Sequence, residues 1–113
     1  MTARENLFSY GTLREEAVQL AIFGHLISGM PDAILRYTLR AYVITDPKAI
    51  AISGRAEHTM LEPTGDVADQ VEGTVFPLTS GELAQADAYE DKAYHRIKVR
   101  LRSGMDAWVY VEV

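Results

Sequence analysis

The order of apolar and polar residues divides the first third of the chain into a strand, a turn and a helix. Residues 7–10 form a short apolar run that favours a strand, and Gly11 ends it. Residues 14–23 favour a helix, because apolar side chains recur at helical spacing and two glutamates stand in the first turn, where the helix dipole favours acids. Gly24 is a natural stop for this helix.

The middle of the chain has one clear pattern and one weak one. Residues 34–44 alternate apolar with polar side chains, which predicts a single strand with one solvent-exposed face. Glycines and prolines interrupt residues 46–73, where residues 56–61 are a candidate strand. Residues 71–77 return to strand composition. Helical signals follow, because Thr79 and Glu82 form a capping-box pattern that begins a helix running to about residue 89 or 90.

The end of the chain predicts a β-hairpin. Residues 94–102 alternate basic with apolar side chains, residues 107–113 place three valines on one face, and residues 103–106 form the loop between them. The simplest interpretation of the basic row is the solvent-exposed face of this hairpin, and a binding patch is the alternative. The row consists of Arg96, Lys98, Arg100 and Arg102. His95 falls on the apolar phase, which favours a hydrogen-bonded core histidine over a catalytic one.

Strands and helices intermingle without a regular strand–helix rhythm, which predicts an α+β fold around an antiparallel or mixed sheet. The chain has 113 residues, of which 48% are hydrophobic and 24% charged, as expected for one globular domain spanning residues 1–113.

Charge and composition exclude several classes of function. With 11 Lys and Arg against 16 Asp and Glu, the net charge is −5, so a nucleic-acid partner is not expected. The chain has no cysteine, which excludes disulfides and thiolate chemistry. We see no secretory signal and no apolar run long enough to span a membrane, so we expect a soluble, cytoplasmic protein without a membrane partner. Its oligomeric state is left open.

The predicted junction between the first strand and the first helix is one candidate site. It consists of Tyr10, Gly11, Thr12 and Leu13. Backbone N–H groups at such a junction can bind a carboxylate or a developing oxyanion, because they have no intrahelical partner. The alternative is a structural turn in which Gly11 relieves strain and Tyr10 packs in the core.

Glu90 is the second candidate. It follows Leu83 and Ala86 at helical spacing, so its carboxylate is expected on the apolar face of the helix. Burial and the negative end of the helix dipole would both raise its pKa, which suits a general acid/base. The alternative is an exposed side chain in the last turn, paired with Lys92.

Other catalytic chemistries lack support in the sequence. The histidines, His25, His58 and His95, are too dispersed for a metal site. No serine elbow and no glycine-rich phosphate loop occurs. We therefore expect neither a bound metal nor a cofactor.

Two separated segments resemble the γ-glutamylcyclotransferase-like family, including its AIG2-like branch. They are LFSYGTLR at 7–14 and ADAYEDKAYHRIKV at 86–99. VEGTVFPL at 71–78 resembles the strand before the family's helix, and WVYV at 108–111 resembles its closing strand. The resemblance implies a small mixed, barrel-like sheet with flanking short helices and a cavity at its mouth. Residues 46–69 match least, and we expect pocket walls from this region, including residues 53–59.

The resemblance also implies a reaction. The backbone amides of residues 10–13 would hold a γ-glutamyl-type small molecule, Glu90 would be the general acid/base, and Tyr110 matches an aromatic residue near the pocket. In γ-glutamyl cyclotransfer the α-amine of the substrate attacks its own γ-carbonyl and releases 5-oxoproline and an amine, so the protein supplies no nucleophile. The alternative function is a non-catalytic small-molecule-binding or interaction protein with the same fold and pocket.

Overall fold

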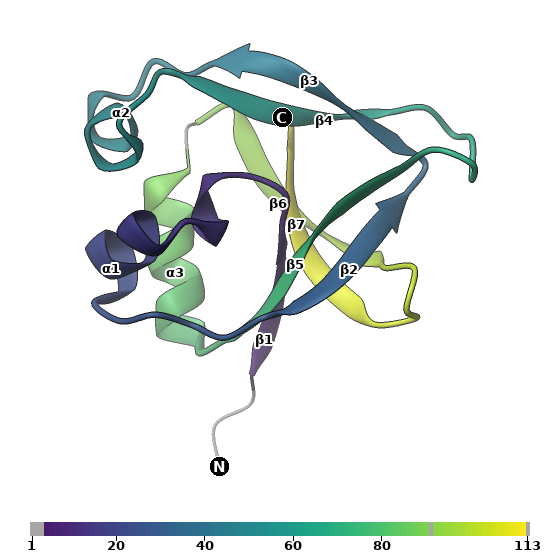
Figure 1. Cartoon of the computed structure of the whole chain (residues 1–113), viewed down its shortest axis with the longest axis horizontal. Coiled ribbons are helices and arrows are strands. Elements are labelled where there is room, and N and C mark those ends of the chain that lie inside the picture. The colour runs from purple at the N-terminus through teal and green to yellow at the C-terminus, as the bar shows by residue number, and fades with distance from the viewer. Residues whose placement is uncertain (1–3, 91, 113) are drawn as a thin grey trace.

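A computed structural model describes residues 4–90 and 92–112, which form seven strands and three α-helices (Figure 1). The elements are β1 (Glu5–Ser9), the 3-10 turn η1 (Thr12–Arg14), α1 (Glu16–Phe23), β2 (Met30–Leu35), β3 (Tyr37–Val43), α2 (Pro47–Ser53), β4 (Glu57–Pro63), β5 (Gln70–Leu78), α3 (Ser80–Tyr89), β6 (Tyr94–Arg100) and β7 (Asp106–Glu112). None of the described helices is long and apolar enough to cross a membrane. The predicted α+β class is confirmed.

The strands form a mixed, barrel-like arrangement. Five of them make one sheet in the order β2-β5-β1-β7-β6, and β3 pairs with β4 in a separate ribbon. The β1–β7 pair is parallel, whereas β1–β5, β2–β5 and β6–β7 are antiparallel. Figure 1 shows the β3–β4 ribbon lying across one end of the sheet, with α1 and α3 together on one side. The central strand β1 therefore lies between the helices and the interior of the barrel.

Strand β1 is buried on both faces. Leu7 and Phe8 are 1% and 0% exposed and point to opposite sides, as successive residues of a strand do. Leu7 packs in a cluster with side chains of α1 and α3, and Phe8 packs in a second cluster with side chains of β4, β5 and β7. The last residues of β1, and the turn that follows them, are thus held from two sides.

A glycine in β5 allows β1 to approach closely. A Cβ atom at Gly73 would lie 2.4 Å from the carbonyl oxygen of Ser9 and 2.7 Å from Cζ of Phe8. Real Cβ atoms do not come this close to backbone, so a side chain at this position would displace the end of β1. Gly73 therefore helps to place the turn at residues 10–13.

Several predicted elements are confirmed, with small changes at their ends. The first helix begins at Glu16 because residues 12–14 form a 3-10 turn, and it ends at Gly24, whose φ is 78°. The capping box of α3 is present, since the Thr79 hydroxyl accepts from the amide of Glu82 and the Glu82 carboxylate accepts from the amide of Thr79. This cap fixes where α3 begins, and Glu90 follows its last residue.

The prediction of one strand over residues 34–44 is wrong. This stretch contains the end of β2 and all of β3, which belong to different sheets. The chain bends at Arg36, whose φ is 76°; its amide donates to Asp69 O at 2.8 Å and its carbonyl accepts from the amide of Thr64 at 2.8 Å. Both strands keep a period of two, so the alternation does not reveal the change of sheet.

Helix α2 was not predicted, although its signals are in the sequence. The Asp46 carboxylate accepts from the amide of Lys48 at 3.0 Å, Pro47 stands in the first turn, and Gly54 ends the helix with a φ of 79°. These are common start and stop residues. The helix is short, and its apolar residues make no distinctive period.

In the hairpin, one prediction is confirmed and one is wrong. Lys98, Arg100 and Arg102 are exposed, as expected for the solvent-facing row, and Arg96 is half-buried. His95 is also exposed, so the prediction of a core histidine is wrong. It stands near the start of the edge strand β6, where the alternation continues beyond the packed core.

The hairpin loop is tied to β2 through a buried carboxylate. Asp32 is 8% exposed and accepts from the Ser103 hydroxyl and from the amides of Ala33 at 2.8 Å and Ser103 at 3.2 Å. The amide of Arg102 donates to Ala33 O at 2.8 Å. These bonds connect the loop at the β6 edge with the strand at the other edge of the sheet, which helps to close the barrel.

Replacing Asp32 with Ala is expected to lower the free energy of unfolding at pH 7 by about 1.5–3 kcal/mol, because the donors of Ser103 and Ala33 lose their charged acceptor. Burial alone raises the pKa of Asp32, but hydrogen bonds from Ser103 and Ala33 and the charge of Arg102 outweigh it, so the pKa lies below its ordinary value. This stabilisation is complete above about pH 4 and is lost as the pH falls through the lowered folded pKa.

Urea unfolding of wild type and Asp32→Ala at pH 7 and at about pH 2.5 tests this expectation. The difference between the two proteins should shrink at the lower pH. Glu72→Ala, which removes an exposed carboxylate from the neighbouring strand β5, is the control and should change stability by less than about 0.5 kcal/mol. An equal difference at both pH values would contradict the assigned role.

Candidate active site

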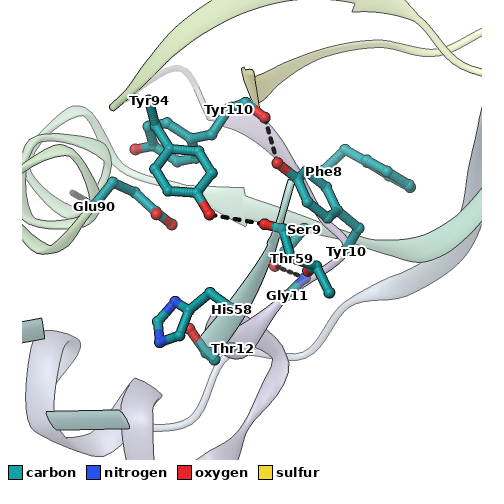
Figure 2. Close-up of a pocket in the computed structure, with 10 residues that line it drawn as sticks. All are labelled: Phe8, Ser9, Tyr10, Gly11, Thr12, His58, Thr59, Glu90, Tyr94 and Tyr110. Carbon is teal, nitrogen blue, oxygen red and sulfur yellow. Dashed lines mark hydrogen bonds between the residues drawn. The ribbon is translucent and has the colours of Figure 1, made fainter. Parts of the chain in front are cut away.

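A pocket opens at the carboxyl end of β1, where residues from β4, β6, β7 and the end of α3 meet (Figure 2). It encloses about 330 Å³, its open mouth included. Its lining residues are Phe8, Ser9, Tyr10, Gly11, Thr12, His58, Thr59, Glu90, Tyr94 and Tyr110. The structure thus brings the turn after β1 and Glu90, two regions far apart in the sequence, to one pocket.

Glu90 reaches the pocket because α3 ends just before it. Glu90 caps the helix with an extended backbone (φ −66°, ψ 139°), while its amide still donates to Ala86 O at 3.1 Å. Its side chain is half-buried, and Figure 2 shows the carboxylate directed toward the space between Tyr94 and His58. Leu83, on the apolar face of α3, packs in the core. Glu90 follows the last residue of α3 and lies at the pocket. Glu90 is therefore not the exposed last-turn side chain of the alternative interpretation.

Two of the tyrosines that line the pocket with Glu90, Tyr10 and Tyr110, have raised pKa values. Burial is the main cause that raises the pKa of Tyr10, and the charges of Tyr94 and Glu90 add to it. Burial likewise raises the pKa of Tyr110, and its hydrogen bond to Asp87 and the charge of Glu90 contribute. These tyrosines therefore stay neutral near pH 7 and can act only as hydrogen-bonding groups.

Two of the tyrosines form walls of the pocket and fasten its strands together. Tyr10 Oη donates to the carbonyl oxygen of Tyr110 at 2.7 Å, which connects the turn with β7. Tyr94 Oη donates to the carbonyl oxygen of Thr59 at 2.7 Å, which connects β6 with the β3–β4 ribbon. Figure 2 shows both bonds on the side of the pocket away from the Glu90 backbone. They connect the elements that form these walls.

The turn presents its backbone to the pocket. Gly11 has a φ of −130°, which any residue can adopt, so relief of strain does not explain this glycine. A Cβ atom here would lie 3.6 Å from Thr59 Oγ1, at the pocket wall. This is an ordinary van der Waals distance, so a small side chain would fit here, and the Gly11 amide donates to Ser9 Oγ at 3.4 Å. The Thr12 hydroxyl lies 2.5 Å from Tyr89 Oη and fastens the turn to α3.

A sequence profile described as "Gamma-glutamyl cyclotransferase, AIG2-like" matches residues 7–112. The chain belongs to this family. The match includes both segments that line the pocket, the turn after β1 and the end of α3.

Solved structures share the fold of this chain. Two are solution structures of Arabidopsis thaliana proteins, with TM-scores of 0.71 and 0.69 at 21% and 18% identity. The matches cover 100% and 97% of this chain, and they cover 64% and 69% of the two Arabidopsis chains. A third is a γ-glutamyl cyclotransferase, with a TM-score of 0.73, 16% identity, and coverage of 97% of this chain and 67% of that one. Among curated proteins nothing matches.

Leu13, a candidate from the predicted junction, and Tyr110, a candidate from the family resemblance, are placed differently from the rest of the site. Leu13 is 3% exposed, packs in the helical core cluster and does not line the pocket. The Tyr110 ring lines the pocket, but its hydroxyl donates to Asp87 Oδ1 at 2.6 Å. Asp87 in turn accepts from Arg96 at 2.6 and 2.9 Å, and the Arg96 guanidinium lies 4.5 Å from the centroid of the Trp108 ring. Tyr110 is therefore anchored from outside the pocket.

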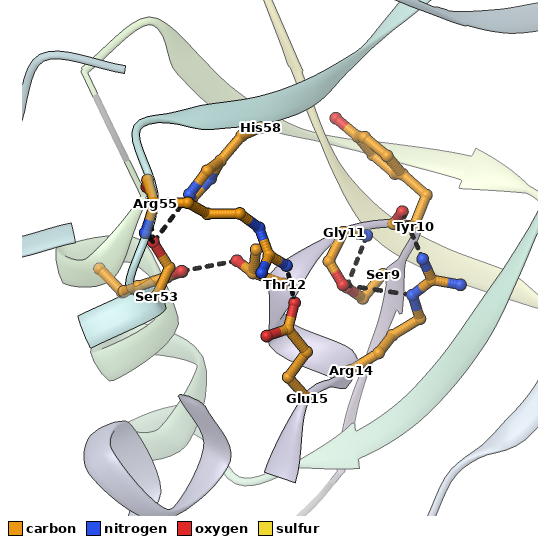
Figure 3. A network of polar contacts seen from close by, with 10 residues as sticks. Ser9, Tyr10, Gly11, Thr12, Arg14, Glu15, Ser53, Arg55 and His58 are labelled. Atoms are coloured by element: carbon orange, nitrogen blue, oxygen red, sulfur yellow. Dashed lines mark hydrogen bonds and ion pairs between the residues drawn. The ribbon is translucent and has the colours of Figure 1, made fainter. Parts of the chain in front are cut away.

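Part of the pocket wall comes from β4, as expected for the weakly matched region. His58 is 9% exposed, and its Nε2 lies 3.0 Å from Ser53 Oγ, which itself donates to Arg55 O at 2.9 Å (Figure 3). Tyr94 was missed by sequence reasoning. Tyr94 lines the pocket together with Glu90, and Figure 2 shows the two side chains next to each other.

A wider groove of about 730 Å³ continues from the pocket. The two share the residues of the turn together with His58 and Thr59, and the groove adds Arg14, Glu15, Arg55 and Glu57. Figure 3 shows the ion pair between Arg55 and Glu15 joining α2's end to the segment after the turn. The groove offers charges of both signs and room for a part of a ligand that the pocket does not hold. Among the described residues no group of three His, Asp or Glu side chains is arranged to hold a metal.

Proposed function

We propose that this protein is a cofactor-independent cyclotransferase that releases 5-oxoproline from a γ-glutamyl amine or a related small amide. The observation that carries this proposal is that Glu90 and the backbone turn after β1 line the same pocket. A carboxylate that can exchange a proton and backbone groups that can orient a carbonyl are the two parts that the reaction needs.

In the proposed reaction the substrate supplies its own nucleophile. Glu90 takes a proton from the α-ammonium group, and the resulting amine attacks the γ-carbonyl carbon to form the C–N bond of a five-membered ring. The bond between the γ-carbon and the leaving nitrogen then breaks as Glu90 returns the proton to that nitrogen, and the ring nitrogen gives up its second proton, which ends on the released amine. The products are 5-oxoproline and a protonated amine, so atoms and charge balance without an added reactant.

Other features of the pocket support these roles. Gly11 and Thr12 line the pocket, and N–H donors of the turn near the γ-carbonyl would stabilise the negative charge that develops on its oxygen. The raised pKa values of Tyr10 and Tyr110 leave these residues neutral, so they do not compete with Glu90 as bases. The wider groove beside the pocket has room for the leaving amine.

A screen of γ-glutamyl peptides and γ-glutamyl amines, read out as 5-oxoproline by mass spectrometry, tests the proposal. At least one compound should give 5-oxoproline and free amine in equal amounts, at a rate proportional to protein concentration. Binding of the same compounds is followed in parallel by NMR. Binding without product from any compound would contradict the proposal and favour a non-catalytic binding protein with the same pocket.

A further inference from the structure

Arg14 lies directly after the turn and is hydrogen-bonded to its backbone. Its Nη2 donates to Tyr10 O at 2.9 Å and its Nε to Gly11 O at 3.2 Å. The backbone amide of Arg14 also donates to Gly11 O, at 3.2 Å. Figure 3 shows the guanidinium folded back against the turn, at the groove that continues from the pocket. One residue thus holds two consecutive carbonyl groups.

Holding these carbonyls also orients the amides that follow them. A trans peptide group is planar, so its N–H points opposite to its C=O. Fixing Tyr10 O therefore fixes the N–H of Gly11, and fixing Gly11 O fixes the N–H of Thr12. Gly11 and Thr12 both line the pocket, and the two carbonyls face the guanidinium; the Gly11 N–H donates at 3.4 Å to Ser9 Oγ, another residue of the pocket lining.

The charge of the guanidinium adds to this effect. A cation bound to a carbonyl oxygen draws electron density from the peptide group and makes its N–H a stronger donor. Among the described residues Arg14 has no carboxylate within ion-pair distance; Glu15 pairs with Arg55 instead. The donors of Arg14 are thus directed to the turn.

We propose that Arg14 is a positioning residue that holds the turn in the conformation that presents the amides of Gly11 and Thr12 to a ligand. The inference rests on the proposed function, in which this turn holds the substrate. The planar fork of a guanidinium can bond two neighbouring carbonyls, whereas a lysine ammonium is a point charge on a flexible chain. The role is therefore specific to arginine.

Steady-state kinetics with the best γ-glutamyl amine tests this role. Arg14→Ala should lower kcat/KM by roughly 10- to 100-fold, with Arg14→Lys between it and wild type. Free guanidinium at low millimolar concentration should restore part of the activity of Arg14→Ala, whereas sodium at equal ionic strength should not. Arg100→Ala removes an exposed arginine on β6 and should match wild type within about twofold. Activity of Arg14→Ala within twofold of wild type would overturn the inference.

A second measurement does not depend on turnover. In ¹H–¹⁵N NMR, Arg14→Ala should move the amide signals of Gly11 and Thr12, while the signals of the β5 amides stay as in wild type. Unchanged signals at Gly11 and Thr12 would refute the inference. If wild type turns over no γ-glutamyl compound, the proposed function fails, and these amide measurements alone decide the role of Arg14.

Discussion

Replacing Glu90 with Gln is expected to lower kcat for 5-oxoproline release by about 10²- to 10⁴-fold. Glutamine has nearly the same shape as glutamate and can still hydrogen-bond, but it cannot take a proton from the α-ammonium group or return one to the leaving nitrogen. Because the turn after β1 and the tyrosine walls are untouched, affinity for a γ-glutamyl ligand should stay within a few-fold of wild type.

Three variants make this test specific. Glu90→Gln is compared with Glu90→Asp, which keeps a carboxylate but retracts it by one methylene and should lose less activity than Glu90→Gln. Glu72→Gln, an exposed position on β5, is the matched control and should retain full activity. Rates are followed by 5-oxoproline release, and binding by NMR titration. Wild-type turnover in Glu90→Gln would remove Glu90 from the mechanism, whatever the binding result.

Replacing Phe8 with Ala is expected to lower the free energy of unfolding by about 3–5 kcal/mol. The Phe8 side chain is 0% exposed and packs between β4, β5 and β7. Its ring fills the space left by Gly73, where a Cβ atom would lie 2.7 Å from Phe8 Cζ. The cavity left by alanine cannot close easily, because β1 is held by β5 on one side and β7 on the other.

Urea unfolding with the Phe8→Ala and Phe8→Leu variants measures this contribution. Leucine keeps much of the buried volume and should cost clearly less than alanine. Phe23→Ala, at the half-buried end of α1, is the control for loss of a phenylalanine outside the barrel, and its cost should be smaller than that of Phe8→Ala. A loss below about 1.5 kcal/mol for Phe8→Ala would contradict the assignment of β1 as the centre of the core. A loss of this size is a large part of the 5–15 kcal/mol typical of a small domain.

Sequence motifs located the helix ends that are fixed by residues within one helical turn. The capping box of Thr79 and Glu82 located the start of α3, and Gly24 located the end of α1, because each acts within one helical turn. Arg36 shows the limit of such signals. Alternation continued through it, yet the chain bends there and changes sheets, because its backbone bonds to Asp69 and Thr64. The prediction that His95 lies in the core was wrong for a related reason, because the sequence pattern does not show where the packed core ends.

The sequence by itself determined the family, the α+β class, and the two segments that line the pocket, because these depend on residue type and on contacts within a few residues. The tertiary structure alone decided that Gly11 and Glu90 share a pocket, that Leu13 packs in the core, and that the Tyr110 hydroxyl bonds to Asp87. These outcomes depend on the parallel pairing of β1 with β7 and on the position of α3 beside β1. Such long-range contacts are selected by the total burial of the folded chain, which no local pattern records.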